Sequence, residues 1–310
     1  MWLYLVVLMG LYYLLRWYRE RQVVSHLRDK FVFITGCDSG FGNLLARQLD
    51  LRGLMVLAAC LTEQGAEQLR NQMSDRLQTV ILDVTKTESI AEATEWVKED
   101  VGDRGLWGLV NNAGILLPAA PNEWQTKDDF SKILNVNLIG LIEVTLSFPP
   151  LIRKTRGRVV NVSSPARRVS LFGGALSDSL RRDLSHFGIR VVLIVPGKYK
   201  TSIFPDNMQD ILEGIWSQVS PEVKESYGQK YFEDCKFFLY SPRAGMAELL
   251  TSQNLSPVAS FMEHNLTAVH PRICYSIDWN SKCFTFALSY LPTPVADFIL
   301  YINYFLSSSF

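Results

Sequence analysis

The sequence predicts an α/β fold: a doubly wound parallel sheet, preceded by an N-terminal membrane anchor and followed by a C-terminal helical cap. Short apolar, β-branched runs alternate with amphipathic helical segments from residue 29 to residue 200. The runs carry few charges, as expected of strands that are buried on both faces. The first run leads directly into a glycine-rich turn. We therefore expect three segments: 1–17 as the anchor, 29–200 as the dinucleotide-binding core, and 201–310 as the cap with an apolar end.

Residues 31–42, FVFITGCDSGFG, are the stretch around which this fold is organised. The first five residues predict a central strand, and Gly36, Gly40 and Gly42 follow at once. An amphipathic helix over 43–52 comes next. Backbone N–H groups and the dipole at a helix N-terminus favour an anion, and glycine lets a pyrophosphate approach the main chain. The alternative is an ordinary strand-to-helix turn, but a strand before and a helix after the glycines favour a dinucleotide site.

Composition excludes several classes of function. The chain has 310 residues, of which 48% are hydrophobic, so a large core is available. Its 31 basic and 31 acidic residues cancel, and no Lys/Arg run indicates a nucleic-acid partner. The five cysteines are odd in number and widely spaced, without a CxxC pair, which argues against a disulfide framework and against a metal such as zinc.

The N-terminus, MWLYLVVLMGLYYLL, is almost wholly apolar, and Arg16, Arg19 and Arg21 follow it among aromatic residues. A cleaved signal peptide would have a basic start and a small-residue cleavage site, and neither is present. The run is short for a bilayer span of ~20 residues, but a thin bilayer or an interfacial helix would accommodate it. The basic flank predicts a main domain on the cytoplasmic side. The alternative is a buried N-terminal helix of the globular domain.

The next two predicted strands bear on the nucleotide. Residues 55–61 form the second strand, whose end reads the adenosine ribose in dinucleotide folds. No basic residue stands there, and the first acid, Glu63, comes slightly late, so we expect NAD, with NADP not excluded. Residues 77–84 form the third strand and carry Asp83, whose carboxylate can accept from an adenine amino group. The alternative role for Asp83 is to cap the helix predicted over 87–101.

The remaining strands place polar side chains at their carboxyl ends. The fourth strand and its turn lie in 106–114, where Asn111 can tie neighbouring strands together. A long helix over 126–146 carries Asn137, which we expect to be buried with a partner because apolar residues flank it. The fifth strand, 157–163, ends at Ser164, where ligands lie in open parallel sheets. The sixth strand, 190–196, closes on Pro196 and Gly197.

The pattern changes after residue 198. Residues 207–238 predict two helices rich in Trp and Tyr, which suit a flat apolar ligand and suggest a substrate lid. Simple core packing of an added helical pair explains the aromatic residues equally well. Residues 285–310 are apolar and are expected to touch the membrane or to close the pocket.

Taken together, the motifs TGCDSGFG, LDVT, NNAG, NVSS and PG, in this order, resemble a short-chain dehydrogenase/reductase over nearly the whole chain. The anchor, CDSGFGN and LWGLVNNAG are similar to the microsomal retinol and hydroxysteroid (3α/17β) dehydrogenases of that superfamily. The resemblance implies a Rossmann fold, an NAD cofactor, a retinoid or steroid alcohol as substrate, and the endoplasmic reticulum membrane as location. A homodimer is left open.

The resemblance also implies roles for individual residues. Ser164 would hold the substrate oxygen, Asn137 would carry a water relay, and Thr201 would reach the carboxamide of the nicotinamide. Asp83 and Val84 would border the adenine. The full set of implied cofactor-binding residues is Thr35, Gly36, Asp38, Ser39, Gly40, Phe41, Gly42, Asp83, Val84, Asn112, Ala113, Gly114, Pro196, Gly197 and Thr201.

One part of the family pattern is missing. A Tyr should follow Ser164 at the start of the next helix, with a Lys one turn later to turn a phenol of pKa ≈ 10 into a general base. No tyrosine of this chain has a lysine four residues later. Against the family pattern, about ten residues, or ~15 Å of helix, are absent between Gly174 and Ala175. Tyr199 is a poor substitute, since it lacks a lysine one helical turn away.

Three hypotheses remain open from the sequence. The first is an NAD(P)-dependent oxidoreductase of retinol or hydroxysteroids, impaired by the missing Tyr and Lys. The second is a catalytically inactive protein that keeps the cofactor or lipid pocket. The third is a variant whose shortened helix disturbs packing.

Overall fold

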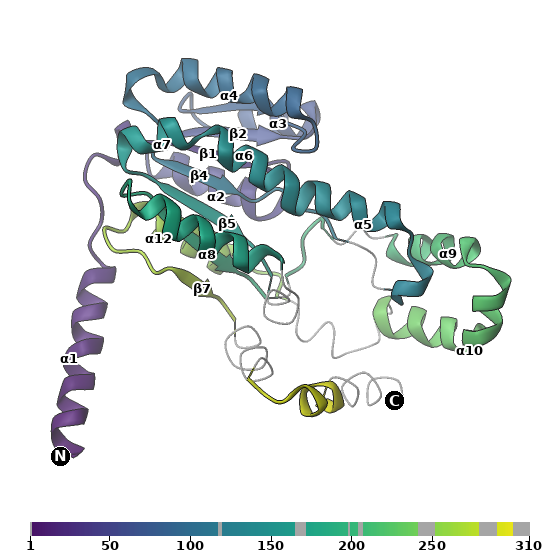
Figure 1. The fold of residues 1–310 in the computed structure, drawn as a ribbon. Helices are drawn as coiled ribbons and strands as arrows, with labels where there is room; N and C mark the ends of the chain where they lie inside the picture. The colour runs from purple at the N-terminus through teal and green to yellow at the C-terminus, as the bar shows by residue number, and fades with distance from the viewer. Residues whose placement is uncertain are drawn as a thin grey trace.

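The computed structural model describes residues 2–116, 120–164, 172–197, 199–203, 207–240, 252–278 and 290–299. Its centre is a seven-stranded sheet in the order β3-β2-β1-β4-β5-β6-β7, in which all pairings are parallel (Figure 1). This topology confirms the predicted doubly wound α/β fold. The strands are β1 Phe31–Thr35, β2 Met55–Cys60, β3 Leu77–Ile81, β4 Gly108–Asn111, β5 Arg158–Val162, β6 Arg190–Val195 and β7 Cys274–Ser276.

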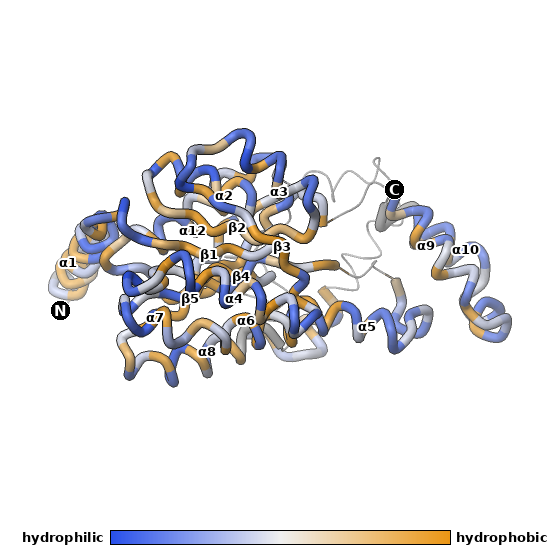
Figure 2. The backbone as a smooth tube through the Cα atoms, turned by 90° about the horizontal axis from the view of Figure 1, so that it is seen from above, coloured by the Kyte–Doolittle hydropathy of each residue, from blue (hydrophilic) through white to orange (hydrophobic). Residues whose placement is uncertain are grey.

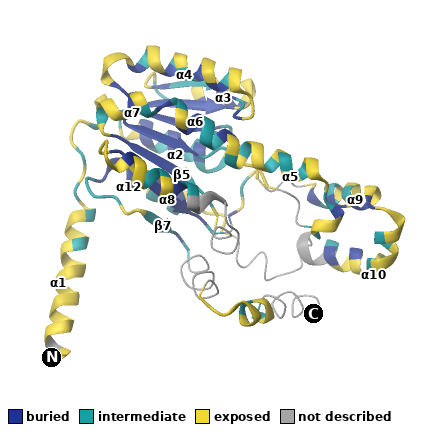
Figure 3. Ribbon diagram, viewed as in Figure 1, coloured by how far each residue is buried: buried dark blue, intermediate teal, exposed yellow. Residues whose placement is uncertain are grey.

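Helices cover both faces of the sheet, and the buried residues concentrate in the strands between them (Figure 3). Alternate residues of β1 serve the two layers: Val32 and Ile34 belong to one apolar cluster, and Phe31 and Phe33 to the other. Figure 2 shows the same strands as hydrophobic stretches inside more polar helices. One layer contains α2 Gly40–Leu51, α3 Glu63–Arg70 and α12 Ser256–Thr267, and the other contains α4 Thr87–Val101, α6 Leu141–Ser147, α7 Pro149–Thr155 and α8 Phe172–Ser185.

The third strand is shorter than the sequence suggests. β3 ends at Ile81, whereas the apolar run predicts a strand to residue 84. The Leu82 N–H still donates to the Cys60 carbonyl at 2.8 Å, but the chain then turns away from β2. The turn forms because the Asp83 carboxylate accepts hydrogen bonds from the Thr85 N–H at 3.0 Å and from its hydroxyl at 2.7 Å.

The long helix predicted over 126–146 is interrupted. It consists of α5 Lys127–Leu134, a π-helical turn η4 Asn135–Gly140, and α6. Gly140 permits the wide turn, since a Cβ there would lie 2.4 Å from the Val84 carbonyl oxygen. Within the described residues, 127–147 is also the one helix long and apolar enough to cross a membrane. It contacts α4 and β4, as a helix of the folded domain does.

The structure adds two core elements that the sequence analysis did not predict, α12 and β7. β7 pairs with β6, so residues 256–276 belong to the sheet layers and not to the cap predicted over 201–310. Arg158, 2% exposed, holds the end of α12 by donating to the carbonyl oxygens of Asn265 and, at 2.7 Å, Ala268. Burial lowers the pKa of Arg158 to about 9. A cation at a helix C-terminus is favourable, which explains this buried charge.

The two helices predicted over 207–238 are confirmed as α9 Met208–Gln218 and α10 Pro221–Tyr240. With Trp124 of the short helix η3 (Asn122–Trp124), they form a separate apolar cluster. Trp216 stacks on Phe232 with ring centroids 5.0 Å apart and lies 4.6 Å from Trp124. These aromatic side chains pack on one another, which favours the core-packing interpretation for them. Of the apolar end predicted over 285–310, residues 285–289 and 300–310 lie outside the described residues.

The N-terminal helix α1 Trp2–Glu20 projects from the domain and is not buried in it (Figure 1). Its large apolar side chains face outward all around the helix, with Trp2 79% and Leu14 61% exposed. Its end is attached firmly: the Glu20 carboxylate accepts two hydrogen bonds from Arg272, at 2.7 and 2.6 Å, and the His264 Nε2 donates to the Glu20 carbonyl at 2.8 Å. The chain that follows α1 pairs with the end of α12 through Val23 and Ala268.

We predict that Glu20→Gln loosens the junction between α1 and the domain. Hydrogen bonding from Arg272 lowers the pKa of Glu20 from 4.5 to about 2. The ionised pair therefore stabilises the junction fully above pH 4.5, and this stability is lost as the pH falls toward 2. The N–H groups of Val24 and Val269 donate across the junction to the carbonyls of Thr267 and Gln22. Their hydrogen exchange should become about tenfold faster in the variant at pH 7.

Glu225→Gln, a change of the same type on α10, serves as the control and should leave these amides unchanged. Equal exchange rates in wild type and Glu20→Gln would contradict the assigned role of the Glu20–Arg272 pair.

Candidate functional site

A set of short hydrogen bonds joins the carboxyl ends of β1 and β4, where the strand order reverses direction. The Thr35 hydroxyl oxygen accepts from the N–H groups of Asn112 and Ala113, each at 3.0 Å. The Asn112 side chain donates back to the carbonyls of Thr35 and Gly36, also at 3.0 Å. Ligands of open parallel sheets bind at such a crossover. The structure thus brings together Thr35, Gly36, Asn112 and Ala113, four of the residues that the sequence nominates.

Two glycines make this close approach possible. Gly36 has a φ of +69°, and a Cβ there would lie 2.8 Å from the Ala113 Cα. A Cβ on Gly42 would lie 2.5 Å from both the Asn112 side-chain nitrogen and the Gly36 carbonyl oxygen. No other residue type fits these positions without moving the backbone. The glycine pattern therefore serves the contact between β1, α2 and β4.

The first turn of α2 presents unpaired N–H donors next to this crossover. Within the described residues, the N–H groups of Gly40, Phe41 and Gly42 have no acceptor, and the Ser39 side chain does not cap the helix. Three such donors at a helix N-terminus form an anion site, so the residues present fit the pyrophosphate of a dinucleotide. The Phe41 ring lies edge-on to Tyr199 with centroids 5.5 Å apart, so Phe41 can contribute only its backbone to that site.

A carboxylate stands at the end of β2, and it comes from the glycine turn. Asp38 accepts from the N–H groups of Leu61 and Thr62 at 2.8 and 2.9 Å, and from the Thr62 hydroxyl at 2.8 Å. The segment that directly follows β2 in the sequence offers only Glu63 as a ribose-reading acid. Local sequence could not show that Asp38 reaches this strand end, because the contact depends on the pairing of β1 with β2.

The carboxylate of Asp83, a predicted adenine contact, is largely occupied by hydrogen bonds within its own turn. Besides the two bonds from Thr85, its carboxylate lies 3.4 Å from the Lys86 ammonium. The hydrogen bonds from Thr85 lower the pKa of Asp83, so it is ionised at neutral pH. Val84 is buried beside it. The alternative role of Asp83 as the cap of the following helix is wrong, because the N-cap residue of α4 is Lys86 and the Asp83 carboxylate bonds to Thr85 in the turn before it.

Asn137 has a partner but is exposed, which corrects the prediction that it is buried. Its side-chain oxygen accepts from the Ile115 N–H at 2.9 Å, and its side-chain nitrogen donates to the Ile115 carbonyl at 2.8 Å. Gly114 lies against this pair, since a Cβ there would sit 3.4 Å from the Asn137 oxygen. The side chain stays open to solvent because residues 114–116 are themselves exposed. Asn137 therefore fixes the chain that leaves β4.

Asn111 joins neighbouring strands, as its structural interpretation predicts. Its side-chain nitrogen donates to Asn161 on β5 at 2.9 Å and to Thr145 on α6 at 2.8 Å. Asn161 in turn donates to the Ser177 hydroxyl on α8 at 3.0 Å. This buried chain of hydrogen bonds ties α8 to the sheet. No motif in the sequence identifies Ser177, because its contribution depends on the docking of α8.

The remaining nominated residues lie along the same edge. Ser164 follows β5 and is exposed, Pro196 is buried at the end of β6, and the Asp278 carboxylate lies against Gly197. The loop after β6 folds onto the glycine turn: Thr201 packs on Gly40, and the hydroxyls of Ser202 and Ser39 are in contact. Thr201 thus lies beside the anion site.

No described residue takes the place of the missing general base. α8 reads FGGALSDSLRRDLS and contains neither Tyr nor Lys, and the residues 165–171 before it lie outside the described part. Tyr199 is 4% exposed, and burial raises the pKa of its phenol, which is the wrong direction for a base. Its ring packs against Phe41 in the core. The structure supports the exclusion of Tyr199.

Comparison with known proteins gives the family. The model of short chain dehydrogenase matches residues 30–211. The chain is 61% identical over 313 residues to human retinol dehydrogenase 16, covering 97% of both chains. It is 60% identical over 311 residues to bovine 17-beta-hydroxysteroid dehydrogenase type 6, covering 97% of this chain and 96% of that protein.

Among solved structures, a short-chain dehydrogenase from Streptomyces avermitilis superposes with a TM-score of 0.63 at 20% identity. It covers 90% of this chain and 97% of its own, which shows that the fold is shared. The crossover geometry, the family model and the two relatives agree. The chain therefore belongs to the short-chain dehydrogenase family, in the group of the retinol and 17-beta-hydroxysteroid dehydrogenases.

Proposed function

We propose that this protein binds a nicotinamide dinucleotide and a retinoid or steroid alcohol, and that it oxidises the alcohol slowly. The observation that carries the proposal is the intact anion site on the first turn of α2, next to a crossover closed by Thr35 and Asn112. Two relatives at 60% identity or more are named for retinol and for a hydroxysteroid, which supports the substrate class.

The nucleotide would lie along the carboxyl edge of the sheet. The N–H groups of Gly40 to Gly42 would hold the pyrophosphate, and Asn112 to Gly114 would line the ribose and nicotinamide side. When bound, the nicotinamide supplies the hydride acceptor. The Asp38 carboxylate and the nearby Glu63 favour NAD, because a 2′-phosphate would meet negative charge at the end of β2.

The residues present support nucleotide binding better than they support proton transfer. Ser164 would hold the substrate oxygen. The Asn137 side chain is already bonded to Ile115, so a water relay at Asn137 would use its main chain. Without a Tyr and Lys on α8, no phenolate among the described residues is positioned to take the alcohol proton. Loss of a general base costs about 10²- to 10⁴-fold in rate.

A catalytically inactive binding protein is the second candidate. Two observations support it: the first turn of α2 offers free N–H donors for a nucleotide, whereas α8 lacks the Tyr and Lys needed for proton transfer. The buried bonds from Asn161 to Ser177 dock α8 even though the helix lacks Tyr and Lys, so the fold does not need those residues. This docking argues against the third hypothesis, a variant with disturbed packing.

We also propose that α1 anchors the protein in the endoplasmic reticulum membrane with the main domain on the cytoplasmic side. Exposed apolar side chains on all sides of α1 support insertion, since water around them is unfavourable. Arg16, Arg19 and Arg21 near the domain end of α1 support the orientation.

We predict that NADH raises the melting temperature of the protein and that Gly42→Ala abolishes this increase. The added Cβ meets the Gly36 carbonyl oxygen and Asn112, which distorts the turn that binds pyrophosphate. At a concentration 100 times its Kd, NADH should stabilise the wild type by about 2.7 kcal/mol. Differential scanning fluorimetry with NADH and NADPH measures both the effect and the cofactor preference.

Gly214→Ala on α9 is the matched control, because a Cβ there meets nothing within 4 Å. It should keep the NADH response. If saturating NADH leaves the melting temperature of the wild type unchanged, the proposed nucleotide site is refuted.

We predict that inserting a helical segment with Tyr-x-x-x-Lys between Gly174 and Ala175 raises turnover by about 10²- to 10⁴-fold, because it restores a phenolic base beside Ser164. The measurement is NADH formation at 340 nm with all-trans-retinol or a 3α-hydroxysteroid. The same insertion with Phe in place of Tyr controls for packing. Fast oxidation by the unmodified chain would disprove the proposed impairment.

A further inference from the structure

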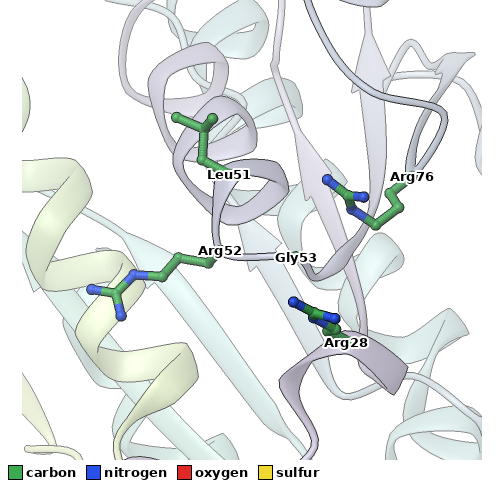
Figure 4. A pocket seen from close by; sticks show the side chains of 5 residues that line it. All are labelled: Arg28, Leu51, Arg52, Gly53 and Arg76. Carbon is green, nitrogen blue, oxygen red and sulfur yellow. The ribbon is translucent and has the colours of Figure 1, made fainter.

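A pocket lined by three arginines lies at the edge of the sheet opposite the nucleotide site. It has a volume of about 260 Å³ and is lined by Arg28, Leu51, Arg52, Gly53 and Arg76 (Figure 4). Each arginine stands just before a strand or at the end of a helix: Arg28 precedes β1, Arg52 ends α2, and Arg76 precedes β3. The amino ends of the parallel strands therefore bring together cations that are far apart in the sequence.

The charges in the pocket are only partly balanced. Arg52 extends toward α12 and pairs with Glu263 at 2.6 Å, and Arg76 lies 3.5 Å from Asp50. Asp50 also accepts from the N–H and the hydroxyl of Ser74, so its charge is shared among several donors. Within the described residues, no carboxylate lies within ion-pair distance of Arg28.

Glycine shapes the floor of the pocket. Gly53 has a φ of +87°, and a Cβ there would lie 3.2 Å from the Arg28 side chain. Arg28 can therefore lie across the Gly53 backbone, and the guanidinium groups of Arg28 and Arg76 face the same hollow (Figure 4). Two planar guanidinium groups around one cavity suit the oxygen atoms of a phosphate group.

The pocket is adjacent to the base of α1. Glu263 pairs with Arg52 at the side of the pocket, while the next residue, His264, bonds to Glu20 at the end of α1. Figure 1 shows α1 leaving the domain at this end of the sheet, with α9 and α10 at the opposite end. A membrane that contains α1 would therefore bring lipid headgroups to the side of the domain that carries the pocket.

We propose that the pocket formed by Arg28, Arg52 and Arg76 binds the phosphate group of an anionic phospholipid and so orients the domain on the membrane. This inference rests on the proposed membrane insertion of α1. Asp29 and Asp75, the acidic neighbours of Arg28 and Arg76, are exposed and take no part in an ion pair with them. The ligand chemistry is a phosphate, and the membrane is the source that the position of α1 favours.

The test is flotation of the full chain with vesicles of phosphatidylcholine, with or without phosphatidylserine. Binding to vesicles of phosphatidylcholine alone measures the insertion of α1. The ratio of the affinity with phosphatidylserine to the affinity without it measures the contribution of the pocket. The proposed membrane insertion and the proposed phosphate site can therefore fail separately. Arg28→Gln should lower this ratio about fivefold, the effect expected of one arginine at an anionic surface. Arg28 has no ion-pair partner to strand, so this variant should fold, and Arg76→Gln should act in the same direction.

Two further variants distinguish a specific phosphate site from general electrostatic attraction of the domain to an anionic membrane. Lys154→Gln removes an exposed cation at the same edge of the sheet but outside the pocket, and it should leave the ratio unchanged. Arg28→Lys keeps the charge but loses the planar fork, and it should lower the ratio. Equal effects of Lys154→Gln and Arg28→Gln would overturn the proposal. The lipid assignment would be overturned by a combination of two results. Inorganic phosphate would stabilise the protein in phosphatidylcholine vesicles in a way that depends on Arg28, and the protein would show no preference for vesicles that contain phosphatidylserine.

Discussion

The structure depends on the hydrogen bonds that lock the end of β1 to the end of β4. Thr35 accepts from two consecutive N–H groups of the β4 turn, and Asn112 returns two bonds to the β1 turn. These bonds require backbone contact that only Gly36 and Gly42 allow. Because they fix the start of α2, they also fix the direction in which its free N–H groups point. The proposed nucleotide site is thus a consequence of how two strands are joined.

Buried hydrogen bonds also explain how the fold holds α8, a helix that contains neither Tyr nor Lys. α8 is held to the sheet by Ser177, Asn161 and Asn111, a chain of buried hydrogen bonds that does not involve Tyr or Lys. Buried polar groups are costly when unpaired, so such a chain strongly specifies the position of the helix. In the proposed function, cofactor binding and proton transfer are therefore separable, because different residues would support them.

The two edges of the sheet differ in chemistry. At the carboxyl edge, helix N-termini and small residues leave donors free for an anion. At the amino edge, arginines meet helix C-termini and carboxylates: Arg158 holds α12, Arg272 holds α1, and Arg28 and Arg76 face a shared hollow. The zero net charge of the chain conceals this separation. Parallel strands create it, since every strand start lies on one side and every strand end on the other.

The sequence alone determined the alternation of strands and helices, the bounds of β1 and α4, the glycine turn and the absence of the Tyr–Lys pair. These features follow from local periodicity and residue type, which neighbouring residues suffice to define. Tertiary structure decided that Asp38 reaches the end of β2, that Asn137 bonds Ile115 in the open, and that β7 completes the sheet. The three residues of β7 are too few to show a recognisable periodicity. The partner of a side chain such as Asp38 is set by the pairing of strands, which no local pattern encodes.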